Sequence, residues 1–175
     1  MTSDPTASRV HRGTRLSFED YHQIQNLIHR YPQLLDSGRF DEMGELFARA
    51  DIYIGGELVI RNDPRAVADL WSRYVRIYPN GTPRTHHVAT NLLIEADGPG
   101  TIRAHSYVLV VQNPPGVPLT PITAGDYLDR FVKDGDTWCF SERHVGNDLF
   151  GDMSHHLLEP MSIDPDARPQ QWDVT

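Results

Sequence analysis

The sequence lacks several features that would indicate particular classes of protein. Its single cysteine, Cys139, excludes an internal disulfide framework, and a reducing cytoplasm is the simplest location for such a chain. It has no apolar run long enough to cross a bilayer and no signal-like segment after the N-terminus, so we expect no membrane association. Basic residues number 16 against 24 acidic ones and form no stripe, which argues against sequence-independent binding of nucleic acid.

The composition is that of one folded domain. With 175 residues, 39% of them hydrophobic and 23% charged, the chain can bury a substantial core. Residues 1–13 are polar and lack periodicity, so we expect a mobile leader there. We expect the domain over residues 14–150. Residues 151–175 are then a tail that packs along the surface or against a neighbouring subunit.

The first half of the chain predicts helices with one hairpin between them. Apolar residues recur at three- and four-residue steps over 18–35, after a serine that can cap a helix. A short helix is expected after the turn residues Asp36-Ser37-Gly38, and residues 51–61 predict a hairpin about two glycines. An Asp-Pro pair then starts a third helix with an apolar stripe over 67–78.

The second half of the chain predicts strands. Segments near 84–97, 100–113, 121–133 and 137–147 are separated by turns rich in glycine, proline and aspartate. Long strands joined in order by short turns predict an antiparallel meander. The expected fold class is therefore α+β, with a cone-shaped, curved antiparallel sheet wrapped around the N-terminal helices and enclosing a pocket.

Two adjacent histidines, His86 and His87, lie in the first of these strands. Successive side chains of a strand point to opposite faces of the sheet, so one of the two imidazoles should face the interior. An inward imidazole needs a partner, and Asp36, at the end of the first helix, is the best candidate. The alternative role for this aspartate is the N-cap of the second helix. The other histidine should be exposed or at a subunit contact.

Four short motifs, considered together, indicate a family. They are Phe18-Glu19-Asp20-Tyr21, Tyr31 with Asp36, Arg84-Thr85-His86-His87, and Trp138-Cys139-Phe140 after Asp134-Gly135. Their order resembles that of the SnoaL-like proteins of the nuclear transport factor 2-like superfamily, whose fold is a cone. Within it the nearest likeness is to scytalone dehydratase, and the spacing of Tyr31 and Asp36 is similar to that of bile-acid dehydratases.

The resemblance implies roles for several residues. His87 matches the position of the catalytic histidine of scytalone dehydratase, and Asp36 matches that of its catalytic aspartate. Tyr53 lies near the position of a tyrosine that holds the substrate in that enzyme. By spacing alone, Trp71, Tyr74 and Tyr107 fit either the core or the pocket lining. His105 lies on the strand that carries a second pocket histidine in the family, six residues before that position and on the same face. The candidate substrate-binding residues are Tyr31, Trp71, His105, Tyr107 and Asp126.

The resemblance implies a cofactor-independent lyase that dehydrates a small hydroxylated carbonyl compound, which is polyketide-, aromatic- or steroid-like. An imidazole suits this proton transfer because it titrates near neutrality, and tyrosine hydroxyls such as those of Tyr31 and Tyr53 can donate to the carbonyl oxygen. An isomerase or cyclase that uses the same pair is an alternative, as is a non-enzymatic ligand-binding module. We expect no metal, because adjacent histidines diverge, and we expect a homodimer or homotrimer.

Overall fold

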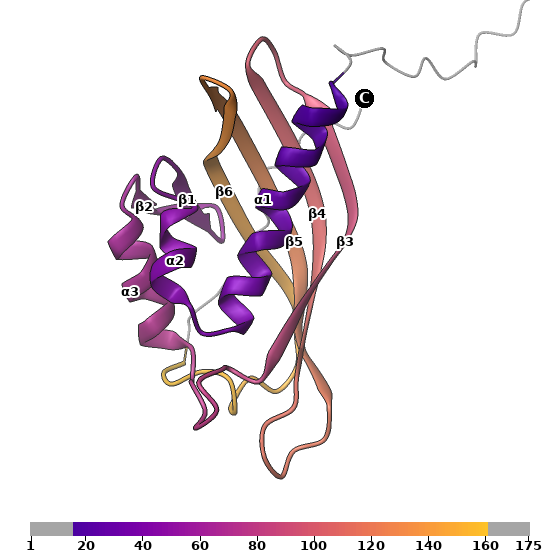
Figure 1. The fold of residues 1–175 in the computed structure, drawn as a ribbon. Helices are drawn as coiled ribbons and strands as arrows, with labels where there is room; N and C mark the ends of the chain where they lie inside the picture. The colour runs from indigo at the N-terminus through magenta and orange to yellow at the C-terminus, as the bar shows by residue number, and fades with distance from the viewer. Residues whose placement is uncertain (1–15, 161–175) are drawn as a thin grey trace, which may run out of the picture.

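The computed structural model describes residues 16–160, in which helices precede a large sheet (Figure 1). The helices are α1 (Phe18–Asp36), α2 (Phe40–Glu45) and α3 (Pro64–Tyr74). The strands are β1 (Asp51–Ile54), β2 (Glu57–Arg61), β3 (Thr85–Ala96), β4 (Thr101–Gln112), β5 (Thr120–Asp134) and β6 (Thr137–Phe150). The α+β class and the curved sheet predicted from the sequence are confirmed. Within the described residues, no helix is long and apolar enough to span a membrane.

The six strands form one sheet in the order β2-β1-β6-β5-β4-β3. Strands β3 to β6 pair antiparallel in sequence order, as predicted, whereas β1 pairs parallel with β6 and so attaches the first hairpin to the sheet. The register of β3 shifts near Asn91, which has a φ of 51°, and such a bulge bends a strand. Figure 1 shows α1 crossing one face of the curved sheet, with α2, α3 and the β1–β2 hairpin beside it.

The N-terminus of α1 is tied to the far end of the sheet. The Ser17 hydroxyl accepts a hydrogen bond from the backbone N–H of Asp20 at 3.0 Å, which is the predicted helix cap. The Asp20 carboxylate in turn accepts the indole N–H of Trp138 at 2.7 Å and the ammonium of Lys133 at 2.8 Å. These contacts fix the direction of α1 and thereby the position of its last residue, Asp36.

A buried ion pair lies in the core beneath α1. Asp129 on β5 and Arg143 on β6 are direct cross-strand partners, and their side chains form two hydrogen bonds of 2.7 and 2.8 Å. Both side chains are only 1% exposed, and the guanidinium lies 4.3 Å from the ring centroid of Tyr31 and 4.6 Å from that of Tyr127. A charge so deeply buried is tolerated because it is paired and stacked on aromatic rings.

The chain after β6 folds back onto the end of α3. Leu157 forms an antiparallel bridge with Val75, and the backbone N–H of Arg76 donates to the carbonyl of His156 at 2.8 Å. The hydroxyl of Tyr78 donates to the carbonyl of His155 at 2.6 Å. Residues 151–160 therefore pack against the helical layer. The expected leader at 1–13 and the rest of the expected tail, 161–175, lie outside the described residues.

Candidate active site

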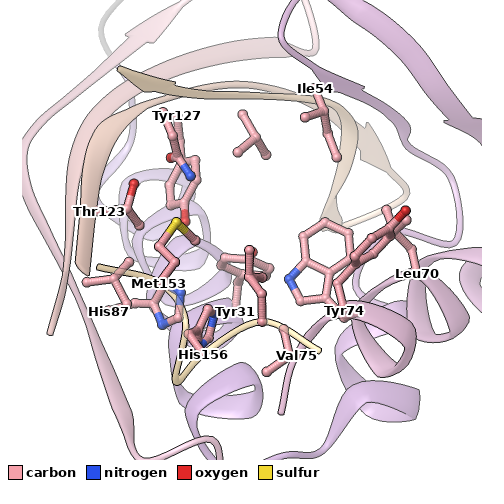
Figure 2. Close-up of a pocket in the computed structure, with 15 residues that line it drawn as sticks. Tyr31, Ile54, Leu70, Tyr74, Val75, His87, Thr123, Tyr127, Met153 and His156 are labelled. Atoms are coloured by element: carbon pink, nitrogen blue, oxygen red, sulfur yellow. The ribbon is translucent and has the colours of Figure 1, made fainter. Parts of the chain in front are cut away.

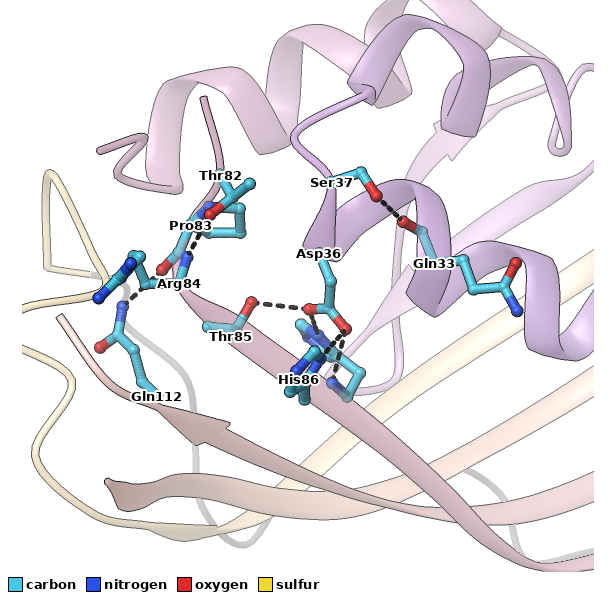
Figure 3. Close-up of polar contacts among 10 residues, drawn as sticks. Gln33, Asp36, Ser37, Thr82, Pro83, Arg84, Thr85, His86 and Gln112 are labelled. Atoms are coloured by element: carbon cyan, nitrogen blue, oxygen red, sulfur yellow. Dashed lines mark hydrogen bonds and ion pairs between the residues drawn. The ribbon is translucent and has the colours of Figure 1, made fainter. Parts of the chain in front are cut away.

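The last residue of α1 meets the start of β3 in a dense set of hydrogen bonds (Figure 3). The carboxylate of Asp36 lies 2.6 Å from Nδ1 of His87 and also accepts the His87 backbone N–H at 2.8 Å. The hydroxyl of Thr85 donates to the same carboxylate at 2.7 Å. An ionised carboxylate can only accept, so the proton between the two side chains is on Nδ1. The Nε2 atom of the neutral ring therefore carries the free lone pair.

This geometry favours the ionised form of Asp36. Burial alone would raise the pKa of its carboxyl group, but the hydrogen bond and charge of His87, together with the Thr85 hydroxyl, lower the pKa below its usual value. The side chains of Asp36 and His87 are 13% and 8% exposed, so water competes little for these hydrogen bonds. Asp36 can therefore orient the imidazole and stabilise its protonated form.

His87 lines a cavity of about 100 Å³ between α3, the sheet and the chain after β6 (Figure 2). Most of its wall is aliphatic or aromatic, as is usual for sites that bind small apolar molecules. The residues with polar side-chain atoms in the lining are Tyr31, Trp71, Tyr74, His87, Thr123, Tyr127, Asn147 and His156. The apolar lining residues are Ile54, Leu70, Val75, Val110, Val145, Met153 and Leu157.

Two tyrosines place hydroxyl groups at this cavity. Tyr31 on α1 and Tyr127 on β5 have ring centroids 5.8 Å apart, and their hydroxyls hydrogen-bond to each other. Burial raises the pKa of both phenols, and the positive charge of Arg143 offsets part of that rise. Both hydroxyls therefore stay protonated at neutral pH; one proton is used in the bond between them, and the other remains to be donated to a ligand oxygen.

Four of the residues proposed from the sequence come together in the structure. Asp36 and His87 are in direct contact, and Tyr31 and Trp71 line the same cavity. His86 lies on the opposite face of β3 with its side chain 85% exposed, as expected from the alternation of strand side chains. The alternative role of Asp36 as N-cap of α2 is wrong, because Arg39 holds that position.

Tyr53 lies away from the cavity. Its ring stacks on His144 at a centroid distance of 4.2 Å, and the next residue, Ile54, contributes to the cavity wall instead. Ile52 is buried in the core and Ile54 lines the cavity, so the alternation of strand side chains points Tyr53, between them, to the other face. The proposed catalytic role of Tyr53 is therefore corrected, and Tyr127 is the second phenol of the site.

His105, Asp126 and Tyr107 also lie outside the cavity. On β4 the even-numbered side chains face the helices, and Val110, the cross-strand partner of His87, is one of them. His105 and Tyr107 therefore point to the outer face, where His105 contacts Asp126 at 3.3 Å. The substrate-binding roles expected for these three residues are corrected accordingly.

Sequence reasoning missed Thr123, Tyr127 and Asn147 on the last strands and His156 beyond them. The two β5 residues sit on its inward face, but the sequence of β5 alone does not mark that face, because apolar side chains occur on both. His156 comes from a segment without periodicity, so only its docking on α3 reveals its position. Among residues 16–160, no three potential metal ligands lie close enough together to hold a metal ion.

Comparison with known proteins supports the assignment of the fold. A family model described as the SnoaL-like domain matches residues 17–144. A protein from Novosphingobium aromaticivorans DSM 12444, provisionally named scytalone dehydratase, aligns with a TM-score of 0.63 and 18% identity, covering 86% of this chain and 92% of that one. No curated protein sequence matches the chain.

Two further solved structures have the same architecture. ActVI-ORFA from Streptomyces coelicolor aligns with a TM-score of 0.59 and 18% identity, covering 73% of this chain and 96% of its own. A Mycobacterium tuberculosis protein of unknown function aligns with a TM-score of 0.59 and 23% identity, covering 73% of this chain and 71% of its own. At such identities the likeness establishes the fold, and the chemistry must be argued from the site.

Proposed function

Since the chain belongs to the SnoaL-like domain family, we propose that it is a cofactor-independent lyase that dehydrates a small hydroxylated carbonyl compound. The observation that carries this proposal is the buried pair of Asp36 and His87 in the wall of a largely apolar cavity. The likeness to a structure provisionally named scytalone dehydratase supports the same reaction class.

His87 is the proton-transfer group in this mechanism. Its Nε2 lone pair removes the proton from the carbon next to the carbonyl, and the electrons of the broken C–H bond form an enolate. The enolate then collapses and expels the β-hydroxyl group, which takes the proton from the imidazolium and leaves as water. The products are an α,β-unsaturated carbonyl compound and water, so atoms and electrons balance without an oxidant or a reductant.

The remaining groups stabilise the two charges that appear during this reaction. The Asp36 carboxylate faces the imidazolium at 2.6 Å, and its ionised form stabilises that positive charge. In the hydrogen-bonded pair of Tyr31 and Tyr127, one hydroxyl donates to the carbonyl oxygen as it becomes negative, which is the role of an oxyanion hole, and the other hydroxyl donates to the first. Acid–base catalysis of this kind contributes roughly 10²–10⁴-fold, so positioning and electrostatics must supply the rest.

The cavity indicates the substrate class. An apolar lining with a few polar groups suits a hydrophobic molecule whose oxygen atoms point toward His87 and the tyrosines. At about 100 Å³ the cavity is smaller than the cavity of about 150 Å³ that accommodates benzene in another protein, so it encloses part of a ring and the rest of the ligand extends through the open side of the pocket. A polyketide-derived or other cyclic β-hydroxyketone is therefore the proposed substrate. The cytoplasmic location and the homodimer or homotrimer expected from the sequence stay predictions.

The test is turnover of single-ring and fused-ring β-hydroxyketones, followed by the absorbance of the conjugated product and by its mass. The His87→Gln variant should lose roughly 10²–10⁴-fold in kcat/KM. The matched control is His105→Gln, which alters a histidine–aspartate pair outside the cavity and should leave kcat/KM unchanged. Equal turnover by His87→Gln would contradict the proposal, and a product of unchanged mass would indicate isomerisation or cyclisation instead.

A further inference from the structure

His156 is a second histidine in the cavity wall, and its ring has no hydrogen-bond partner among residues 16–160. Its side chain is 7% exposed, and its Nδ1 atom is buried without a partner. Its neighbour His155 is exposed. Buried polar atoms are paired in the great majority of cases, so an unpaired one on a residue of a cavity wall points to a contact that a ligand would supply.

The position of His156 is fixed by the fold. Its backbone N–H donates to the carbonyl of Met153 at 2.9 Å, and its carbonyl accepts the N–H of Arg76 at 2.8 Å. On either side, the His155 carbonyl accepts the Tyr78 hydroxyl and the Leu158 N–H donates to the carbonyl of Tyr74 at 2.8 Å. Three backbone–backbone hydrogen bonds and one from a tyrosine hydroxyl therefore hold this segment in place, and the imidazole lies at the same end of the cavity as His87 (Figure 2).

The ring of His156 is neutral at neutral pH. Burial, and to a smaller extent the charge of His87, lower its pKa to about 4, although the carboxylate of Asp36 acts in the opposite direction. A neutral imidazole of this kind is a weak base, but it retains one N–H group. Neutral histidines act in this way in other enzymes, where they polarise a substrate carbonyl and leave proton removal to a different residue.

We propose that His156 contacts the ligand directly and donates a hydrogen bond from its neutral imidazole to the enolate or phenolate oxygen of a ring-sized molecule. This inference rests on the proposed function in one respect, that the cavity beside His87 is the ligand site. The two histidines then have separate roles: His87 transfers the proton, and His156 stabilises the oxygen anion. The C-terminal segment is then part of the active site.

The test uses 4-nitrophenol, whose phenolate oxygen imitates an enolate and whose absorbance reports its ionisation. Binding is measured for the wild type, His156→Phe, His156→Gln and the control His155→Ala. We expect His156→Phe to raise the Kd roughly tenfold or more, because a hydrogen bond to a charged oxygen is lost. His156→Gln should recover part of the affinity by restoring an N–H donor, and His155→Ala should bind as the wild type does.

A second readout keeps the test independent of whether each variant folds. In wild-type protein labelled with ¹⁵N-histidine, 4-nitrophenol should shift the ring resonances of His156 as well as those of His87. A shift confined to His87, or the absence of 4-nitrophenol binding, would overturn the role of His156. Failure of the proposed lyase function appears separately, as turnover of β-hydroxyketones that does not depend on His87.

Discussion

Two histidine–aspartate pairs lie on opposite faces of the same sheet. Asp36 and His87 are 2.6 Å apart on the inner face, with side chains 13% and 8% exposed. His105 and Asp126 are 3.3 Å apart on the outer face, with side chains 30% and 33% exposed. The inner carboxylate also accepts the Thr85 hydroxyl and a backbone N–H, whereas no other described side chain hydrogen-bonds to the outer one.

The difference shows that environment, more than residue type, makes such a pair useful for proton transfer. On the outer face water screens the charges and competes for the hydrogen bond, so the pair contributes little to stability. On the inner face the ionised carboxylate is favoured, the imidazole is held by Asp36 through Nδ1, and its ring lines a cavity. The same two residue types therefore form a candidate catalytic dyad at one place and a surface contact at the other.

The two pairs should differ most in the stability that is lost when their aspartate is removed. Asp36→Ala leaves an imidazole, a hydroxyl and a backbone N–H without their common acceptor, and should lower the free energy of unfolding by roughly 3–5 kcal/mol. Asp126→Ala removes one exposed contact, with an expected cost of less than about 1 kcal/mol. Urea denaturation of both variants and the wild type measures the difference. Equal losses of stability would show that burial of the inner pair has no energetic consequence.

The inner site should also make stability depend on pH, because the pKa of His156 is about 4 in the folded chain and near 6.5 in the unfolded chain. Between these values the unfolded chain binds the proton more readily, so the free energy of unfolding falls as the pH drops from 6.5 to 4. The expected loss is at most about 3 kcal/mol. His156→Phe should remove it, and an unchanged pH slope in that variant would contradict the assignment.

The smallest expected effect concerns the Thr85 hydroxyl, which has no counterpart in the outer pair. Thr85→Val keeps the shape of the side chain but deletes a donor to Asp36, with an expected cost of about 1 kcal/mol. Because that donor helps to lower the pKa of the carboxyl group, the variant should titrate Asp36 at a higher pH. The ¹³C resonance of the carboxyl carbon measures this titration, and an unshifted titration would exclude the hydroxyl as a cause.

The sequence predicted the order of the elements and the contact of Asp36 with His87. Hydrophobic periodicity marked the helices, turn residues marked the meander, and strand alternation required one of two adjacent histidines to face inward. The same alternation could not tell which face of β4 was the inner one, because both faces carry apolar side chains. His105 was therefore placed on the wrong side of the sheet.

Other features depend on contacts that are distant in sequence. Asp129 and Arg143 would be expected at the surface, and only their cross-strand register in β5 and β6 brings them together in the core. The docking of His156 on the end of α3 follows no periodic pattern. These are tertiary effects, which local patterns do not encode.

The central claim is that Asp36 holds His87 with its free nitrogen toward the cavity, and the tautomer of the His87 ring tests it most directly. ¹⁵N NMR spectra of the histidine rings, recorded at a pH where His87 is neutral, distinguish a protonated nitrogen from a bare one. The account predicts a proton on Nδ1, bonded to Asp36, and a bare Nε2. A proton on Nε2, or a ring that averages between both tautomers, would contradict it.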